Sequence, residues 1–378
     1  MSKLAEVALL FLKLGCVAFG GPAAHIAMRE DEVVTKRKWM TREHFLDLVG
    51  ATNLIPGPNS TEMAIHCGFH RAGWAGLVAA GVCFILPAVM MTGVLAYGYV
   101  TYGHVPAWEP VFYGIRPAVI AIMLGAVMKL GKKALKGWEL GVIGGVVMIG
   151  ALTGLSEIFA ILGGGVAGMI WLNIKRALPG PKSFAPPVWP ALALPTAAAA
   201  SVPVVSVSAA QVFLSFLKIG SVLFGSGYVL IAYLEGEFID RLGWLTRSQL
   251  LDAVAIGQFT PGPVLSTSTF IGYQMQGVTG AILATLGIFL PSFVFVAILN
   301  PYIPKLRKSP WASCFLDAVN VSVVGIMAAV VVEWTAGAVT DWRSGLIAAL
   351  SIAVVLIARQ TNVVWIVLGG ALLGLLLV

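Results

Sequence analysis

Long apolar runs recur from one end of the chain to the other, and they restrict the fold more than any other feature. Eight runs approach the ~20 residues that cross a bilayer as a helix: 74–100, 111–128, 138–155, 158–174, 277–299, 315–332, 344–358 and 361–378. Only 11% of the 378 residues are charged, whereas an average soluble domain has about 25%. We therefore predict an all-α, polytopic membrane protein.

The positive charges lie in the loops between these runs, although the net charge of +7 would also suit a nucleic-acid-binding protein. Loop cations of this kind orient membrane helices, so no nucleic-acid partner is expected. The cysteines are isolated inside apolar segments, at Cys16, Cys67, Cys83 and Cys314. Because the sequence contains neither C-x-x-C nor H-E-x-x-H, it predicts no metal site and no cofactor.

The chain is a tandem duplication. Phe11–Pro58 aligns with Phe216–Pro263 without a gap and with 20 identities in 48 positions. After a deletion of one residue, the register continues at an offset of 204. The segment between the copies is rich in Pro, Ala and Ser, which is typical of a semi-extended linker. We predict an N-terminal repeat over 1–174, a cytoplasmic linker over 175–208 and a C-terminal repeat over 209–378.

The loop charges of the two repeats are reversed. In the first repeat the cations crowd two loops, at Arg29, Lys36, Arg37, Lys38, Arg42, Lys129, Lys132, Lys133 and Lys136, while the loop 101–110 has none. In the second repeat the loop that matches 101–110 carries Lys305, Arg307 and Lys308. Because cations favour the cytoplasmic side, the repeats are predicted to be inverted relative to each other.

Each repeat contains one Pro-Gly-Pro sequence, at Pro56-Gly57-Pro58 and at Pro261-Gly262-Pro263. The flanking segments of the first copy, 42–55 and 59–71, are each ~20 Å long as helices, which is too short for a ~30 Å hydrocarbon core. We expect a re-entrant helical hairpin here, and therefore about five spans plus one hairpin in each inverted half.

Hydroxyl side chains follow both turns, where a new helix is expected to begin. Non-helical backbone at membrane depth has to line a cavity or be covered by protein, and unpaired N–H groups at helix N-termini attract anions. The candidate substrate-binding residues at the turns are Asn59, Ser60, Thr61, Ser266 and Thr267. Simple helix capping by these side chains is the alternative.

Three cations lie within the expected spans, where charges are costly and mark functional sites. Lys13 and Lys218 occupy the same repeat position, and Arg116 lies in the apolar stretch YGIRPAVIAIM. All three are candidate anion-binding residues. The alternatives are snorkelling of the lysines to the membrane surface and an interfacial position for Arg116.

Two pairs of acidic residues match between the repeats, Glu32 with Glu237 and Asp47 with Asp252. We expect these carboxylates to pair with nearby cations in preference to carrying coupled protons. Glu62 follows the first turn and has no acidic counterpart. It is therefore the candidate proton-coupling residue.

Three motifs together resemble the chromate ion transporter family: F-G-G-P, W-x-T-x-x-x-F-x-D, and Pro-Gly-Pro about ten residues later. The resemblance covers both repeats, as in the long, two-domain form of this family, and falls on Phe19, Gly20, Gly21, Pro22, Trp39, Asp47, Phe224, Gly225, Trp244, Asp252 and both Pro-Gly-Pro turns. The second repeat departs from the motif at Ser226 and Gly227. The resemblance implies a bacterial, multi-pass protein of the cytoplasmic membrane that exports chromate and confers chromate resistance.

Our main hypothesis is a secondary transporter that moves a tetrahedral oxyanion by alternating access between the two halves. Transport of sulfate or another oxyanion, by uptake or exchange, is the first alternative, because sulfate shares the charge and shape of chromate. An intramembrane enzyme is a second alternative, although the sequence has no cofactor motif and no nucleophile–base constellation. The expected partners are chromate or sulfate and membrane lipid, and a homodimer is left open.

Overall fold

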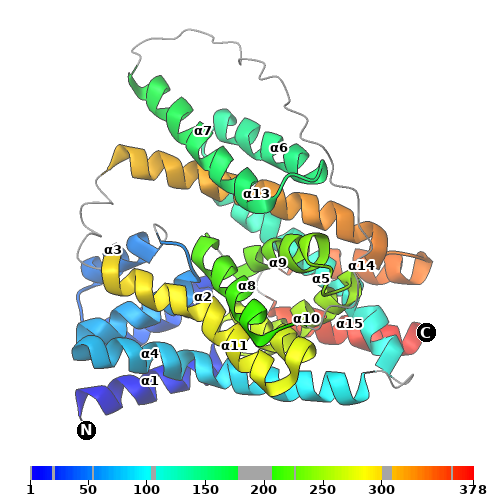
Figure 1. Ribbon diagram of the computed structural model, residues 1–378, viewed down its shortest axis with the longest axis horizontal. Coiled ribbons are helices and arrows are strands. Elements are labelled where there is room, and N and C mark those ends of the chain that lie inside the picture. Colours follow the sequence, from blue (N-terminus) through cyan, green and yellow to red (C-terminus); the bar gives the residue numbers. More distant parts are fainter. Residues whose placement is uncertain are drawn as a thin grey trace.

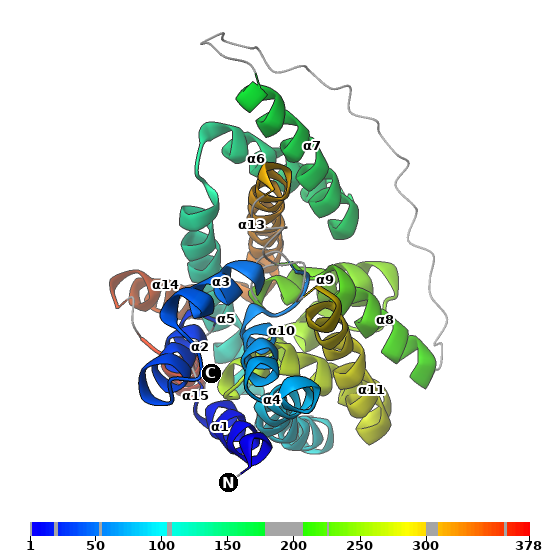
Figure 2. The same cartoon turned by 90° about the vertical axis from the view of Figure 1, so that its left-hand side faces the viewer.

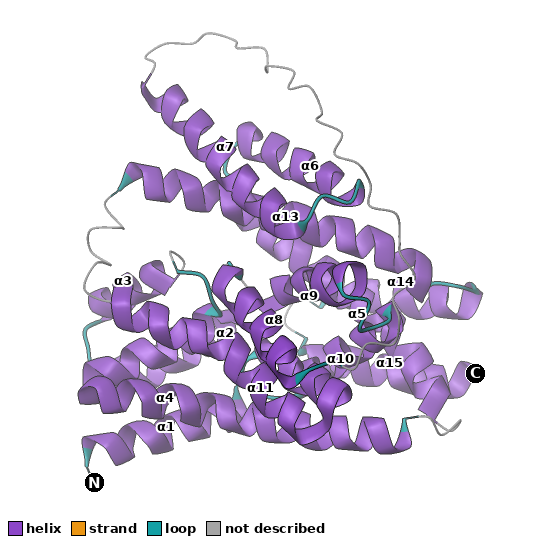
Figure 3. Cartoon of the chain, in the orientation of Figure 1, coloured by secondary structure: helices purple, strands orange, loops and turns teal. Residues whose placement is uncertain are grey.

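The computed structural model describes residues 2–18, 22–52, 55–103, 108–177, 207–224, 227–299, 309–358 and 361–378. These described residues form helices and turns without a strand (Figure 3). Five helical segments are long and apolar enough to cross a membrane: Asn59–Tyr102, Glu109–Ala134, Glu157–Lys175, Val264–Ile298 and Pro310–Ala338. The prediction of an all-α polytopic membrane protein is confirmed, while the count of ten spans stays a prediction.

Within the described residues, the first half contains seven α-helices and one π-helix. In chain order they are α1 (Lys3–Val17), α2 (Pro22–Arg29), η1 (Glu30–Lys36), α3 (Arg42–Thr52), α4 (Asn59–Tyr102), α5 (Glu109–Ala134), α6 (Trp138–Leu152) and α7 (Glu157–Ala177). Most of the predicted linker, 178–206, lies outside the described residues.

The second half follows the same order. Its elements are α8 (Ala209–Val222), η3 (Gly227–Val229), α9 (Leu230–Leu234), η4 (Glu235–Arg241), α10 (Arg247–Phe259), η5 (Val264–Ser266), α11 (Thr267–Leu299), α13 (Pro310–Ala338), α14 (Trp342–Ile357) and α15 (Val363–Leu377). The π-helices η1 and η4 occupy the same repeat positions. Such π-helical turns are rare and are frequent at functional sites.

The longest helices, α4 and α11, are each broken at a matched glycine. Gly73 has φ of +62° and Gly277 has φ of +58°, a left-handed conformation that glycine adopts without steric cost. A Cβ on Gly68 would overlap the carbonyl oxygen of Gly76, so the chain folds back tightly on itself after the break. The same contact recurs in α11. Each long helix is therefore two helices joined at a sharp turn.

The second part of α4 and of α11 exposes a continuous apolar stripe. Large apolar side chains are exposed at every fourth position, Trp74, Val78, Val82, Leu86, Met90 and Val94 in α4, and Val278, Ile282, Leu286, Leu290, Val294 and Ile298 in α11. Residues four apart lie on one face of a helix, and a stripe of this length is unfavourable in water. These faces are suited to contact with lipid.

The two halves exchange their last helices. Helices α6 and α7 of the first half pack on α13 of the second, and together they form the upper part of the molecule in Figures 1 and 2. In return, α14 and α15 of the second half pack on α5 of the first. Further contacts between the halves join α4 to α11, α5 to α13 and α5 to α10.

Candidate functional site

The two Pro-Gly-Pro turns are bound to opposite halves by a reciprocal pair of backbone hydrogen bonds. The N–H of Gly57 donates to the carbonyl oxygen of Leu223 at 2.5 Å, and the N–H of Gly262 donates to that of Ala18 at 2.8 Å. Ala18 and Leu223 are equivalent in the repeat, and each follows the first helix of its half. Each turn thus donates a hydrogen bond to the residue that ends the first helix of the other half.

Both turns lead directly into a helix, as the sequence predicts. Helix α4 begins at Asn59 and η5 begins at Val264. Pro58 and Pro263 occupy the N-cap position of these helices. The carbonyl oxygen of Pro58 accepts from the N–H groups of the residues at 61 and 62, so the first turn of α4 is well formed.

A small cavity lies where the two turns meet. It is lined by residues of both halves: His25, Pro58, Asn59, Ser60, Gly227, Val264 and Leu265. Its volume is about 10 Å³, which is the space that one water molecule needs. This conformation is therefore closed, and a tetrahedral oxyanion would require the junction to open.

The candidate hydroxyl residues differ between the halves. Ser60 lines the cavity, and the buried Oγ1 of Thr61 has no hydrogen-bond partner among the described residues. In the second half Thr267 donates to the carbonyl oxygen of Val264 at 2.8 Å. Ser266 lies 3.3 Å from the hydroxyl of Thr260. The second-half hydroxyls thus make contacts within their own turn, although neither contact is a helix cap, which would accept from a backbone N–H group.

The two matched lysines form matched ion pairs. Lys13 lies 3.1 Å from Glu32, and Lys218 lies 2.7 Å from Glu237. The lysine side chains are 60% and 43% exposed, and neither lines the cavity between the turns. The expected pairing of these carboxylates is confirmed, and both lysine charges are compensated in this conformation.

Arg116 is also paired, with a residue of the opposite half. Its Nε and Nη2 donate to the two carboxylate oxygens of Asp252 at 3.0 and 2.9 Å. The hydroxyl of Tyr99 donates to the same carboxylate at 2.9 Å. Asp252 is buried, so this bidentate pair links α5 to α10 and confirms the pairing expected for Asp252.

Glu62 is buried directly behind the first turn. It is fully buried, and neither carboxylate oxygen has a hydrogen-bond partner in the part of the chain that the structure describes. A Cβ on Gly57 would overlap its Oε1, so the carboxyl group packs against the glycine of the turn. The equivalent residue in the second half is Ser266.

One residue at this site was assigned wrongly from the sequence. Arg29 was grouped with the loop cations, but it lies in the last turn of α2 and is only 1% exposed. It was misplaced because a cation next to other charged residues is usually a loop residue. His25, one turn earlier on the same helix, is buried as well, and the second half has a leucine at the equivalent position.

Of the family-motif residues, Phe19, Gly20, Gly21 and Gly225 lie outside the described residues. Pro22 begins α2. The Trp39 indole donates to Glu6 at 3.2 Å, and the ring of Trp244 stacks on Phe238. The ring of Phe224 contacts Phe315 edge-on, and Asp47 also has an interaction partner. The motif residues that the structure describes thus hold helices together around the junction.

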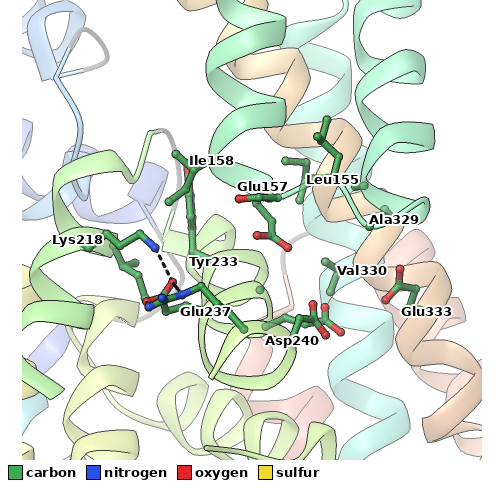
Figure 4. A pocket seen from close by; sticks show the side chains of 18 residues that line it. Leu155, Glu157, Ile158, Lys218, Tyr233, Glu237, Asp240, Ala329, Val330 and Glu333 are labelled. Carbon is green, nitrogen blue, oxygen red and sulfur yellow. Dashed lines mark hydrogen bonds and ion pairs between the residues drawn. The ribbon is translucent and has the colours of Figure 1, made fainter. Parts of the chain in front are cut away.

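A second, larger cavity of about 280 Å³ lies between α7, η4 and α13 (Figure 4). Its wall carries the carboxyl groups of Glu157, Asp240 and Glu333, and the Lys218–Glu237 pair lies at one side. Burial raises the pKa of Glu235, another lining residue, to about 7, and it also raises the pKa of Asp240. This cavity is acidic and does not suit an anion.

The fold and the junction define a polytopic helical membrane transport protein, in which two sequence-related halves meet at paired helix breaks. The family model for chromate transporters matches residues 5–169 and 210–375. The chain therefore belongs to the chromate transporter family, and it is a multi-pass membrane protein.

Three relatives illustrate the match. A chromate transport protein of Cupriavidus metallidurans is 30% identical over 98% of this chain and 92% of its own length. A chromate transport protein of Pseudomonas aeruginosa is 32% identical over 85% of this chain and 79% of its own length. An uncharacterized transporter of Methanocaldococcus jannaschii is 28% identical over 97% and 92%. No solved structure matches the chain.

Proposed function

We propose that the protein is a secondary transporter that carries chromate out of the cytoplasm. The observation that supports this most directly is the reciprocal pair of hydrogen bonds, Gly57 to Leu223 and Gly262 to Ala18, which closes a cavity between two helix N-termini. Helix N-termini favour anions. The family and the printed names of the relatives, which are transport proteins and not enzymes, point to chromate as the anion.

In this proposal the repeats 1–174 and 209–378 are inverted halves joined by the linker 175–208, and each Pro-Gly-Pro turn is the tip of a re-entrant hairpin. Alternating access then follows from movement of one half against the other around the junction. The reversed loop charges of the sequence support the inversion. The two backbone bonds at the junction are few enough to be broken and remade in each transport cycle.

The membrane potential supplies a driving force for export. The outward movement of an anion across an inside-negative membrane is favoured by ~2.3 kcal/mol per negative charge per 100 mV. Chromate carries two negative charges. Glu62 provides a second route, since a buried carboxyl group beside the turn can bind a proton in one conformation and release it in another.

Flux of labelled chromate and labelled sulfate into proteoliposomes, under an imposed potential or pH gradient, tests the proposal. We expect saturable chromate flux that responds to the potential, and recovery of the anion chemically unchanged. Faster flux of sulfate than of chromate would favour the sulfate alternative. Reduction or other conversion of the anion would favour an enzyme, and the absence of saturable flux of either anion would refute the proposed function.

A further inference from the structure

Arg29 is a buried cation that finds no hydrogen-bond partner in the part of the chain that the structure describes. Its side chain is 1% exposed, and none of its three guanidinium nitrogens bonds to any of the described residues. An arginine carries five N–H donors, and buried polar groups in native proteins are nearly always bonded. The guanidinium carbon instead lies 4.3 Å from the ring centroid of Phe84, so an aromatic face holds the cation.

The fold itself does not require a cation at this position. The equivalent residue in the second half is Leu234, which is fully buried, and the equivalent of Phe84 is the fully buried Ile288. An ordinary apolar pair therefore fills the same place in the same local structure. Because burying a charge is costly and a cation–π contact offsets only part of that cost, Arg29 has a role that Leu234 lacks.

Arg29 lies one helical turn from the junction of the two halves. His25, four residues earlier in α2, donates from Nε2 to the carbonyl oxygen of Ala18 at 3.0 Å. That oxygen also accepts the N–H of Gly262 across the junction. His25 lines the small cavity together with Pro58 and Ser60. The helix that carries the buried cation thus reaches directly to the closed cavity.

We infer that Arg29 is the cation that binds the transported oxyanion when the junction opens, and that Phe84 holds its guanidinium while the junction is closed. This inference rests on the proposed function and extends it to a residue and a substrate class. The planar guanidinium can donate two parallel N–H bonds to two oxygens of one tetrahedral anion. The class is therefore tetrahedral dianions, with chromate and sulfate recognised by the same chemistry.

The second half contributes differently to this site. At the positions of His25 and Arg29 it has the buried Leu230 and Leu234. In this inference only the first half carries the charge that binds the anion, and the second half has apolar side chains at the equivalent positions. Gly227, at which the second repeat departs from the family motif, lines the small cavity.

The test compares Arg29→Leu and Arg29→Lys with Arg42→Leu, which removes a cation that is 74% exposed and paired with Glu30. The readouts are flux of labelled chromate in proteoliposomes and the rise in melting temperature on adding chromate or sulfate to the purified protein. For Arg29→Leu we expect normal folding, loss of the anion-dependent rise, and KM raised about tenfold or more. Arg29→Lys keeps the positive charge but cannot donate two parallel N–H bonds, so a smaller rise in KM is expected. Arg42→Leu should match the wild type.

Three results would overturn the inference. The first is wild-type KM and anion protection in Arg29→Leu or Arg29→Lys, which would leave the proposed transport function intact. The second is failure of Arg29→Leu to fold, because the fold would then need the cation. The third is equal loss of affinity in Arg42→Leu, which would indicate a general charge effect. By contrast, absence of saturable flux in the wild type would refute the proposed function itself.

Discussion

The backbone N–H of Gly57 donates a 2.5 Å hydrogen bond to the carbonyl oxygen of Leu223, in the other half of the chain. Gly57 can make this bond because its φ is +142°, a conformation that residues with a Cβ rarely adopt. The glycine of the first turn is therefore needed twice, for its backbone conformation and for its close contact with Glu62.

Gly57→Ala is expected to destabilise the closed junction. Left-handed backbone costs a residue with a Cβ about 1–2 kcal/mol, and the new methyl group would also overlap Glu62 Oε1 and lie 2.7 Å from Ser292 Oγ. We expect a lower melting temperature and chromate flux reduced at least tenfold. The measurement is thermal unfolding of the purified protein beside a proteoliposome assay.

Gly93→Ala is the matched control, since a Cβ at this helical position meets no atom within 4 Å. It should behave like the wild type in both assays. Gly262→Ala is expected to be intermediate, because its φ is +91° but its nearest neighbour would be Ala88 Cβ at 3.1 Å. Wild-type stability and flux in Gly57→Ala would contradict the role of the junction.

The bidentate pair of Arg116 and Asp252 provides a second prediction. Removing one member of a buried ion pair typically costs about 3–5 kcal/mol, because the other charge is left unpaired, and the 34% exposure of Arg116 favours the lower end. We expect Arg116→Gln and Asp252→Asn each to lower the melting temperature, and the double variant to lower it by less than the sum. A double-mutant cycle measures this coupling, and strict additivity would show that the pair contributes nothing.

The sequence predicts those features of the fold that depend on residue type and local conformation. The Pro-Gly-Pro turns begin new helices because proline interrupts the preceding helix and glycine allows positive φ. The spans follow from apolar runs of sufficient length, and the expectation that Glu32 pairs with a nearby cation follows from matched acidic residues in both repeats. In each case a short stretch of residues contains the whole physical reason.

Features that depend on packing between distant segments could not be predicted in this way. The exchange of α6 and α7 onto α13 joins apolar surfaces that have no distinctive pattern, and apolar contact is not directional. Arg29 was misplaced for the same reason, because its burial results from the packing of α2 against α4. From its charge alone, Arg29 was expected to lie in a loop.

The inverted arrangement of the repeats predicts opposite sidedness of two equivalent loops. Single cysteines at Gly103 and Ser309, in a chain whose four native cysteines are replaced, report the side by labelling with a membrane-impermeant reagent. We expect the cysteine at 103 to react from the outside and the one at 309 only after permeabilisation, because the loop 300–310 carries cations and 101–110 does not. Reaction of both from one side would exclude inversion.

The acidic cavity predicts a pH dependence of stability. Burial raises the pKa of Glu235 from 4.5 to about 7, so the folded state favours the protonated carboxyl group. The resulting stabilisation is complete below about pH 4.5 and is lost as the pH rises through about 7. We expect the melting temperature to fall between about pH 5 and pH 8, and Glu235→Gln to weaken this dependence.

The control for Glu235→Gln is Glu30→Gln, at the equivalent position of the first half, where the side chain is 28% exposed and paired with Arg42. This variant should keep the pH dependence of the wild type. An equally steep dependence in Glu235→Gln would assign the effect to another group of the cavity.

Glu62 carries the last prediction, which concerns energy coupling. An ionised carboxylate without a partner is costly to bury, so the closed conformation is expected to hold Glu62 with its proton bound. Glu62→Gln retains the shape of the protonated side chain but cannot release a proton. We therefore expect this variant to fold and to transport chromate in response to a membrane potential, while its flux no longer responds to a pH gradient.

Proteoliposomes with independently imposed gradients separate the two responses, and Glu43→Gln, which changes an exposed carboxylate, is the control. A pH response that persists in Glu62→Gln would place the coupled proton on another group.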